Sequence, residues 1–258
     1  WERYGTMGWA DLLAPAIELA GRGLPVNFMT TIRIAAAMKE LRNFPESRNV
    51  FLPDGAVPVP ELGQPIPHIP MGNLKATLER LAVAGHRDLY DGDIAVQIAK
   101  DVEEGSGSLR INDLASYEAL ECDPLSRDYG GGIVHAPAGM TAGPTMMRVL
   151  EQIEGRIGSG VPGPDDLTAI ATALASAYAE RFKTMGDPDD SRDPTCTTHL
   201  TVIDGNGNMV SLTQTLLSSF GSKVVLPSSG ILMNNGILWF DPVPDRPNSL
   251  KAGKRPLS

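Results

Sequence analysis

The chain has 258 residues, of which 42% are hydrophobic, and its formal net charge at pH 7 is −9. Acidic residues are spread along it and no stretch is rich in Lys and Arg, which argues against binding to nucleic acid or to an anionic membrane surface. No apolar run reaches the roughly 20 residues that a membrane-spanning helix needs. The composition therefore predicts a mixed α and β protein that acts on a small-molecule or peptide substrate.

The two cysteines, Cys122 and Cys196, are too few for a disulfide framework and lack the spacing of metal ligands. We therefore expect neither a metal nor another cofactor. Neither the cysteines nor the first residues, which begin at Trp1 without a signal-like segment, indicate a cellular compartment.

The first part of the chain predicts helices. Apolar residues recur at helical spacing from Gly8 to Gly23, where Gly-Arg-Gly is a stop signal. Asn27 is placed to cap a second helix that runs to about Arg42. Residues 44–70 are dense in Pro and Gly and have no sustained period, so they predict an irregular excursion. Amphipathic helices are expected next, over 73–84 and 91–103.

Shorter elements follow, and the composition then changes. Asn112 is placed to cap a short helix that ends near Tyr117. The remaining predicted elements are strands over 119–122 and 133–136 around a triple-glycine turn, and helices over 145–154 and 165–184. An acidic, proline-containing linker occupies 186–194, and a β-hairpin is predicted immediately after Thr197.

A threonine at the start of this hairpin is suited to two reactions. Its hydroxyl can attack the preceding peptide bond and, later, a substrate amide. Once the bond between Cys196 and Thr197 is cut, the freed α-amine lies beside the hydroxyl and can act as its general base, since its pKa is near neutrality. By itself this string is weak evidence, because Thr pairs in strands are usually structural.

A longer set of strings adds specificity. After the linker these are TTHLTVID at 197–204, TQT at 213–215, FG at 220–221, SGILMNN at 229–235 and GKRPLS at 253–258. Before it they are PAIELA at 15–20, YDG at 90–92, DPL at 123–125 and GDPD at 186–189. In this order the chain resembles the gamma-glutamyltranspeptidase family over nearly its whole length.

The resemblance implies an α+β fold, the four-layer αββα sandwich of the N-terminal-nucleophile hydrolases. It implies a precursor that cleaves itself between Cys196 and Thr197, so that 1–196 belongs to a mostly helical large subunit and 197–258 opens a β-rich catalytic subunit within one mature domain. Thr197 is then the nucleophile, Thr215 supports its hydroxyl, and Ser258 holds the α-carboxylate of the substrate. The partners implied are an amide or peptide substrate and the two subunits themselves.

Two family positions are not met. The family has Asn where this chain has Leu217, and the carboxylate that binds the α-amino group of a glutamyl substrate is replaced by Trp239. Asn235 and Gly236 are expected to line the substrate site beside Trp239. Because a buried ammonium without a counter-charge is costly, we expect an acyl group other than ordinary γ-glutamyl unless Asp241 takes over the missing role.

The residues around Thr197 offer three local alternatives. Cys196 is itself a candidate nucleophile if cleavage occurs one residue earlier. His199 is a candidate base, but it is as readily a structural hydrogen-bonding residue. Asp204, Asn206 and Asn208 alternate like calcium ligands, but Met209 and Thr215 stand where a calcium loop needs Gly and Glu, which favours a hairpin turn.

Two functional classes remain. The first is an enzyme that cleaves a small amide by hydrolysis or acyl transfer, on γ-glutamyl compounds or on an oxamate-like or acylase-type amide. The second is a scaffold that has kept the fold without turnover.

The family also has an N-terminal segment with a carboxylate-binding Arg and a C-terminal segment with oxyanion-hole glycines. Neither is present, so we interpret the chain as an internal piece of a longer protein, in which each missing oxyanion donor costs a factor on the order of 10² to 10³ in rate.

Overall fold

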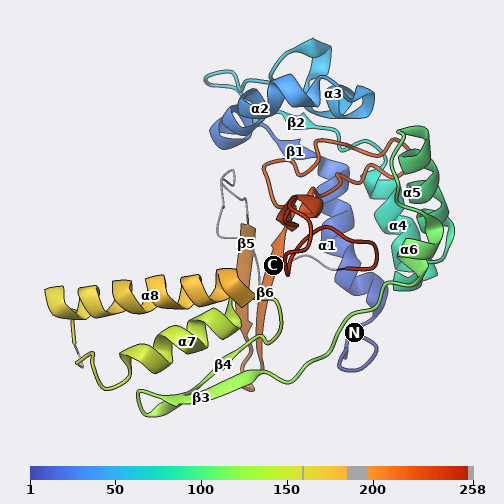
Figure 1. Ribbon diagram of the computed structural model, residues 1–258. Helices are drawn as coiled ribbons and strands as arrows, with labels where there is room; N and C mark the ends of the chain where they lie inside the picture. Colours follow the sequence, from blue (N-terminus) through green and yellow to red (C-terminus); the bar gives the residue numbers. More distant parts are fainter. Residues whose placement is uncertain (159, 185–196, 255–258) are drawn as a thin grey trace. The chain divides into compact units, whose positions relative to one another are not determined.

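The computed structural model describes residues 1–158, 160–184 and 197–254, with the backbone alone at Thr197 (Figure 1). These residues divide into two compact units, one formed by Trp1–Glu118 and Pro194–Asn235, the other by Ala119–Asp193 and Gly236–Ser258. We call them the first unit and the second unit. This division describes packing, and the predicted subunit boundary at Thr197 stays a prediction.

The first unit contains most of the helices and two of the antiparallel strand pairs, β1–β2 and β5–β6. Its elements are α1 (Trp9–Arg22), β1 (Leu24–Pro25), α2 (Phe28–Leu41), α3 (Pro45–Phe51), η1 (Pro53–Gly55), β2 (His68–Ile69), α4 (Leu74–Ala84), η2 (His86–Leu89), α5 (Asp93–Glu104), α6 (Ile111–Ala115), β5 (Thr197–Ile203) and β6 (Met209–Thr215).

The second unit contains the strand pair β3–β4 and the helices α7 and α8. Its elements are β3 (Leu125–Tyr129), β4 (Gly132–Ala136), α7 (Gly143–Ile153), α8 (Pro164–Thr184) and the short helix η3 (Gly236–Trp239). The predicted mixture of helices and strands is confirmed. In the described part of the chain, no helix combines the length and apolar character needed to cross a membrane.

The segment predicted to be irregular is partly helical. Pro45 stands at the start of α3, where its fixed φ suits a helix and its missing N–H is not needed. Val50 and Phe51 are 5% and 2% exposed, and they join α2 in one core. The members of this core are Val26, Ile34, Ala37, Leu41, Val50, Phe51, Leu52, Ile69 and Val225. Burial of these side chains stabilises a helix that local composition did not predict.

The helices predicted from amphipathic spacing are confirmed. Asn27 accepts a hydrogen bond from the backbone N–H of Thr30 at 3.0 Å and so caps α2 as predicted. The stripe of α5 buries Ile94 and Ile98, which form a second core with Leu226. Leu226 follows the hairpin in sequence, so this core joins the helices to the segment after β6.

Two boundaries were predicted wrongly. The helix expected to start after Asn112 starts two residues earlier, at Ile111, because the backbone N–H of Arg110 donates to the Asp113 carboxylate at 2.8 Å. The strand expected over 119–122 is instead β3, at Leu125–Tyr129, and it pairs with β4 from Leu125 opposite Ala136 to Tyr129 opposite Gly132. Alternate residues of β3 are half-buried, which gives this register one inner face.

Asp88 joins α4 to α5. Its carboxylate accepts hydrogen bonds from Nε and Nη2 of Arg80 at 2.7 and 2.9 Å and from the backbone N–H of Asp93 at 3.1 Å. The hydrogen bond from Arg80 is the main cause that lowers the pKa of Asp88, and it outweighs the effect of burial. The ionised carboxylate thus also accepts a hydrogen bond from a backbone N–H in the first turn of α5, where the helix dipole favours negative charge.

Gly230 lies where the segment after the hairpin passes the start of α4. Its φ is +70°, and a Cβ built there would lie 2.4 Å from the backbone N of Leu74. The side chain of Asn73 is used in the same contact, since it donates to the carbonyl of Pro227 at 2.8 Å and makes no cap. Only glycine fits this position without a backbone shift.

We therefore expect Gly230→Ala to lower the stability of the first unit by about 2–4 kcal/mol, from the left-handed backbone and the clash together. The matched control is Gly55→Ala, because Gly55 has φ +77° with no atom within 4 Å of its added Cβ. The control should lose about 1 kcal/mol. Thermal unfolding of the two variants checks this, and equal losses would contradict the role assigned to the contact with Leu74.

Candidate functional site

Strands β5 and β6 form the predicted hairpin. Seven residue pairs are in register, from Ile203 opposite Met209 beside the turn to Thr197 opposite Thr215 at the open end. Opposite Cα atoms in an antiparallel pair lie about 4.5–5.5 Å apart. The register thus brings together the two threonines that were predicted to act in catalysis, although they are far apart in sequence.

The hairpin turn is closed by Asp204. Its carboxylate accepts hydrogen bonds from the backbone N–H groups of Asn206 and Asn208 at 2.9 and 2.8 Å and from the Asn208 side chain at 2.8 Å. The hydrogen bond from the Asn208 side chain is the first cause that lowers the pKa of Asp204. These oxygens serve the turn, which agrees with a hairpin in place of a calcium loop.

His199 is held by hydroxyl groups of the same hairpin. Its Nδ1 lies 2.7 Å from Thr213 Oγ1, and its Nε2 lies 3.2 Å from Ser211 Oγ and 3.3 Å from Thr201 Oγ1. Both ring nitrogens therefore have partners on β5 and β6. This arrangement favours the structural interpretation of His199 over a role as base.

Thr215 ends β6 and starts a strained turn. Its Oγ1 accepts a hydrogen bond from the backbone N–H of Leu217 at 2.9 Å. Leu217 has φ +77° and is only 5% exposed. A left-handed backbone at a branched, buried residue costs on the order of 1–3 kcal/mol and occurs mainly where surrounding contacts enforce it. The Thr215 hydroxyl is one such contact.

Asn235 closes the loop that follows. Its backbone N–H donates to the carbonyl of Leu216 at 3.1 Å. Its side-chain oxygen accepts from the N–H of Ser218 at 3.1 Å, and its Nδ2 donates to Ser218 Oγ at 2.7 Å. The structure thus uses both ends of this amide to fix the loop, while the predicted contact of Asn235 with substrate stays a prediction.

Lys223 brings a positive charge into the same loop. Its Nζ donates to Ser218 Oγ at 3.0 Å and to the carbonyl of Gly221 at 3.1 Å. Its backbone has φ +64°, and its carbonyl accepts a hydrogen bond from the buried hydroxyl of Ser47 at 2.6 Å. Ser47 lies on α3, so the helical core holds this strained loop in place.

The other predicted site residues belong to the second unit or lie outside the described residues. Gly236 and Trp239 bound the short helix η3, and the carbonyl of Trp239 accepts from Asn248 Nδ2 at 2.6 Å. Asp241 is 3% exposed, and its carboxylate accepts from the backbone N–H of Val243 at 2.8 Å and lies 3.4 Å from the Arg246 guanidinium. This carboxylate therefore already has a cationic partner.

Cys196 and Ser258 lie outside the described residues, so their predicted roles stay predictions. Within the described ranges, no group of three or more His, Cys, Asp or Glu side chains is arranged to hold a metal ion.

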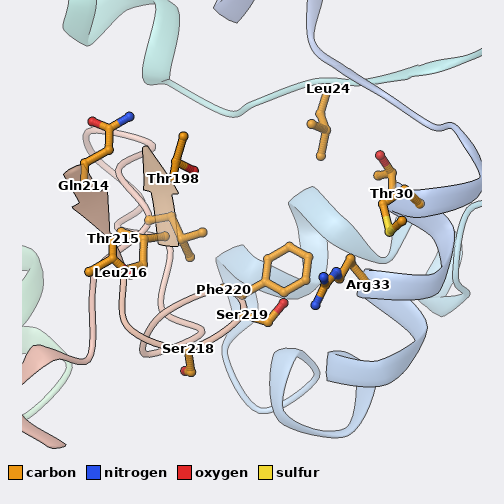
Figure 2. Close-up of a pocket in the computed structure, with 12 residues that line it drawn as sticks. Leu24, Thr30, Arg33, Thr198, Gln214, Thr215, Leu216, Ser218, Ser219 and Phe220 are labelled. Carbon is orange, nitrogen blue, oxygen red and sulfur yellow. The ribbon is translucent and has the colours of Figure 1, made fainter. Parts of the chain in front are cut away.

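A cavity of about 630 Å³ lies in the first unit, between α2 and the end of the hairpin (Figure 2). Thr198, Gln214 and Thr215 form its hairpin wall, and Arg33 extends from α2 toward Ser219 and Phe220. Its volume falls in the range of pockets that bind small molecules. The cavity thus adjoins one of the two threonines that the register brings together.

Sequence reasoning missed Ser218, Lys223 and Arg33. Phe220-Gly221 is one of the strings that carry the resemblance, and it marks the strained loop that holds the first two. No signal in a single sequence distinguishes Arg33 from other basic residues on exposed helix faces.

Comparison with known proteins identifies the family of the chain. The family model described as Gamma-glutamyltranspeptidase matches residues 1–196 and 189–258, which together cover the chain. Glutathione hydrolase proenzyme of Escherichia coli (strain K12) is 29% identical over the whole chain and 52% of its own length. Acylase ACY 1 proenzyme of Pseudomonas sp. (strain SE83) is 30% identical over 98% of the chain and 51% of its own length.

Two solved structures share the fold. The structure of cephalosporin acylase from Bacillus halodurans matches 99% of this chain and 53% of its own length, with a TM-score of 0.85 and 26% identity. The structure of the gamma-glutamyltranspeptidase of Helicobacter pylori matches 75% of this chain and 55% of its own length, with a TM-score of 0.65 and 26% identity. The likeness confirms the predicted α+β fold class of the N-terminal-nucleophile hydrolases. The chain, which spans about half the length of these relatives, belongs to the gamma-glutamyltranspeptidase family.

Proposed function

We propose that the protein to which this chain belongs is an autoprocessing amide hydrolase or acyltransferase with Thr197 as its nucleophile. Cleavage between Cys196 and Thr197 exposes an α-amine. This amine takes the proton of the Thr197 hydroxyl as the oxygen attacks the amide carbon, and it then gives the proton to the leaving nitrogen. Water or a second amine cleaves the resulting acyl ester and restores the hydroxyl.

The observation that carries this proposal is the register of the hairpin, which sets Thr197 opposite Thr215. In this mechanism the Thr215 hydroxyl orients the nucleophile. Its hydrogen bond from the N–H of Leu217 fixes the direction of that hydroxyl oxygen, and the loop network of Asn235 and Ser218 holds the turn. A preorganised nucleophile is what this chemistry requires.

Contacts across the cleavage point support a mature protein of two associated chains. Residues before Thr197 hydrogen-bond to residues after it: the Asp101 carboxylate accepts from the N–H of Ser228 at 2.8 Å, and the Thr77 hydroxyl donates to the carbonyl of Ser229 at 2.8 Å. Buried side chains of both segments also share one core. Cleavage at Thr197 breaks none of these contacts, so the products are expected to stay together.

Three residues bear on which acyl group the site accepts. Trp239 stands where the resemblance implies a carboxylate, which leaves an α-ammonium without its counter-charge, and Leu217 replaces a polar Asn. The Asp241 carboxylate is already paired with Arg246. These observations favour a second candidate function. This candidate is an acylase for amides of dicarboxylic acids that lack the α-amino group, and it is favoured over a glutathione hydrolase. One of the relatives carries the name acylase.

We expect the processed full-length protein to cleave a glutaryl amide at least about 10-fold faster, in kcat/KM, than the γ-glutamyl amide of the same amine, because an uncompensated ammonium costs more than about 1.4 kcal/mol. Acid quenching during turnover, followed by mass analysis of the small subunit, should show the acyl group on the peptide that begins at Thr197.

The control is Trp239→Asp, which restores a carboxylate and should move the preference toward the γ-glutamyl amide. A wild type that prefers the γ-glutamyl amide would contradict the acylase assignment and would favour a glutathione hydrolase. A protein that is processed but forms no acyl ester with any member of the panel would support the non-catalytic scaffold.

A further inference from the structure

The loop at 216–223, which follows β6, carries backbone strain at three residues with side chains. Leu217, Phe220 and Lys223 have φ of +77°, +58° and +64°, in the left-handed region that such residues disfavour. Glycine adopts this conformation without the steric cost that lysine meets. Strain of this kind persists where neighbouring contacts enforce it, and it clusters at functional sites. The presence of lysine at a position that suits glycine indicates that its side chain has a role.

The ammonium of Lys223 joins the two ends of the turn at 218–221. Its Nζ donates to Ser218 Oγ at 3.0 Å and to the carbonyl of Gly221 at 3.1 Å. The Ser218 hydroxyl donates to the same carbonyl at 3.0 Å and accepts from Asn235 Nδ2 at 2.7 Å. Hydrogen bonds from a charged donor are stronger than those between neutral groups. The ammonium therefore fixes the position of Ser218 within the loop.

Helix α3 holds the backbone of Lys223. The hydroxyl of Ser47, a residue with 0% exposure, donates to the Lys223 carbonyl at 2.6 Å and accepts from the N–H of Val225 at 2.9 Å. Loss of these hydrogen bonds is costly because the groups involved are buried. Ser47 thus keeps Lys223 in the left-handed conformation from which its side chain reaches Ser218, five residues earlier in the chain.

The loop is connected to the proposed nucleophile through Thr215. The N–H of Leu217 donates to Thr215 Oγ1 at 2.9 Å, and Thr215 stands opposite Thr197 in the hairpin. Ser218 follows Leu217 directly, and its own N–H donates to Asn235 Oδ1 at 3.1 Å. Consecutive Cα atoms keep a fixed separation of about 3.8 Å, so a displaced Ser218 also moves Leu217. The hydrogen bond that orients the Thr215 hydroxyl then changes direction.

We propose that Lys223 is a positioning residue for the nucleophile and that it acts through Ser218 and Thr215. The inference rests on the proposed function, because there is a nucleophile to position only if Thr197 attacks an amide. Lys223 is not among the described residues that line the cavity beside Thr215, which agrees with an indirect role. Without its ammonium, Ser218 loses a charged donor, and the strained turn at Leu217 is free to relax.

The test uses the processed full-length protein with the glutaryl and γ-glutamyl amides of one chromogenic amine. Lys223→Gly removes the ammonium and relieves the left-handed backbone, so its thermal stability should stay close to that of the wild type. We expect kcat to fall about 10-fold on the amide that the wild type prefers, with little change in KM, because a misplaced nucleophile reacts slowly without weaker binding. Lys223→Met should lose as much, and Lys223→Arg, which keeps a cation, should recover most of the loss.

A double variant tests whether Lys223 acts through Thr215. Residues that belong to one network give losses that do not add as free energies. Lys223→Gly combined with Thr215→Val should therefore be no slower than Thr215→Val alone. The matched control is Ser106→Gly, which relieves a left-handed residue with φ +62° outside this loop and should leave kcat unchanged.

Three results would overturn the role of Lys223 while leaving the nucleophile intact. These are a wild-type kcat in Lys223→Gly, losses that multiply in the double variant, and losses among the three Lys223 variants that follow their thermal stability in place of their charge. Acylation of the small subunit in the wild type is measured alongside. If that subunit is never acylated, the proposed function fails first, and the role of Lys223 fails with it.

Discussion

Thr197→Ala in the full-length parent protein is expected to give one uncleaved chain, while the wild type gives two fragments, the smaller beginning at Thr197. Alanine has no hydroxyl to attack the bond after Cys196, and an uncut chain has no α-amine at residue 197 to act as base. Amide cleavage should then fall to background, since removal of a nucleophile costs a factor on the order of 10⁶ in kcat. Intact mass after incubation at neutral pH measures the first effect, and a chromogenic amide measures the second.

Two controls separate the nucleophile from its surroundings. Thr197→Ser keeps a hydroxyl and should still be cleaved, with the smaller fragment beginning at Ser in that position. Thr198→Ala alters the next residue of β5 and should be cleaved like the wild type. If the Thr197→Ala chain is instead cleaved one residue earlier, and this cleavage is lost when Cys196→Ala is added to it, Cys196 is the nucleophile.

The sequence predicted those parts of the fold that depend on local periodicity or capping. The stripes of α4 and α5, the cap at Asn27 and the hairpin after Thr197 all follow from residues close together in the chain. Helix α3 was missed, because its stability comes from Val50 and Phe51 packing into a distant core and its composition is typical of irregular chain. The strand β3 was misplaced for a related reason, since its register is fixed by pairing with β4.

The candidate site shows the same division. Thr197 and Thr215 were predicted through resemblance, and the hairpin register then brings them opposite each other. The loop that follows could not be predicted, because Leu217, Phe220 and Lys223 adopt left-handed backbone conformations that their residue types disfavour. Contacts with other elements, such as the Ser47 hydroxyl on the carbonyl of Lys223, enforce them. Strain that local propensity opposes is expected where position matters for function.

The second large effect is expected at Thr215. Thr215→Val keeps the shape of the side chain but removes the oxygen that accepts from the N–H of Leu217 at 2.9 Å. The strained turn then loses one of the contacts that hold it, and the proposed support for the Thr197 hydroxyl is lost as well. We expect kcat for amide cleavage to fall roughly 100-fold with a small change in KM, because a nucleophile displaced by about 1 Å loses that much rate.

Thr215→Ser, which keeps the hydroxyl, should recover most of this loss, and Thr213→Val provides the matched control on the same strand. Thr213 bonds to His199 on the hairpin, so its replacement removes a structural contact of similar size without touching the turn at Leu217. Comparable losses of kcat in Thr213→Val and Thr215→Val would mean that both threonines act only through hairpin stability. A loss confined to Thr215→Val, with thermal stability close to wild type, would place its hydroxyl in the chemistry of the nucleophile.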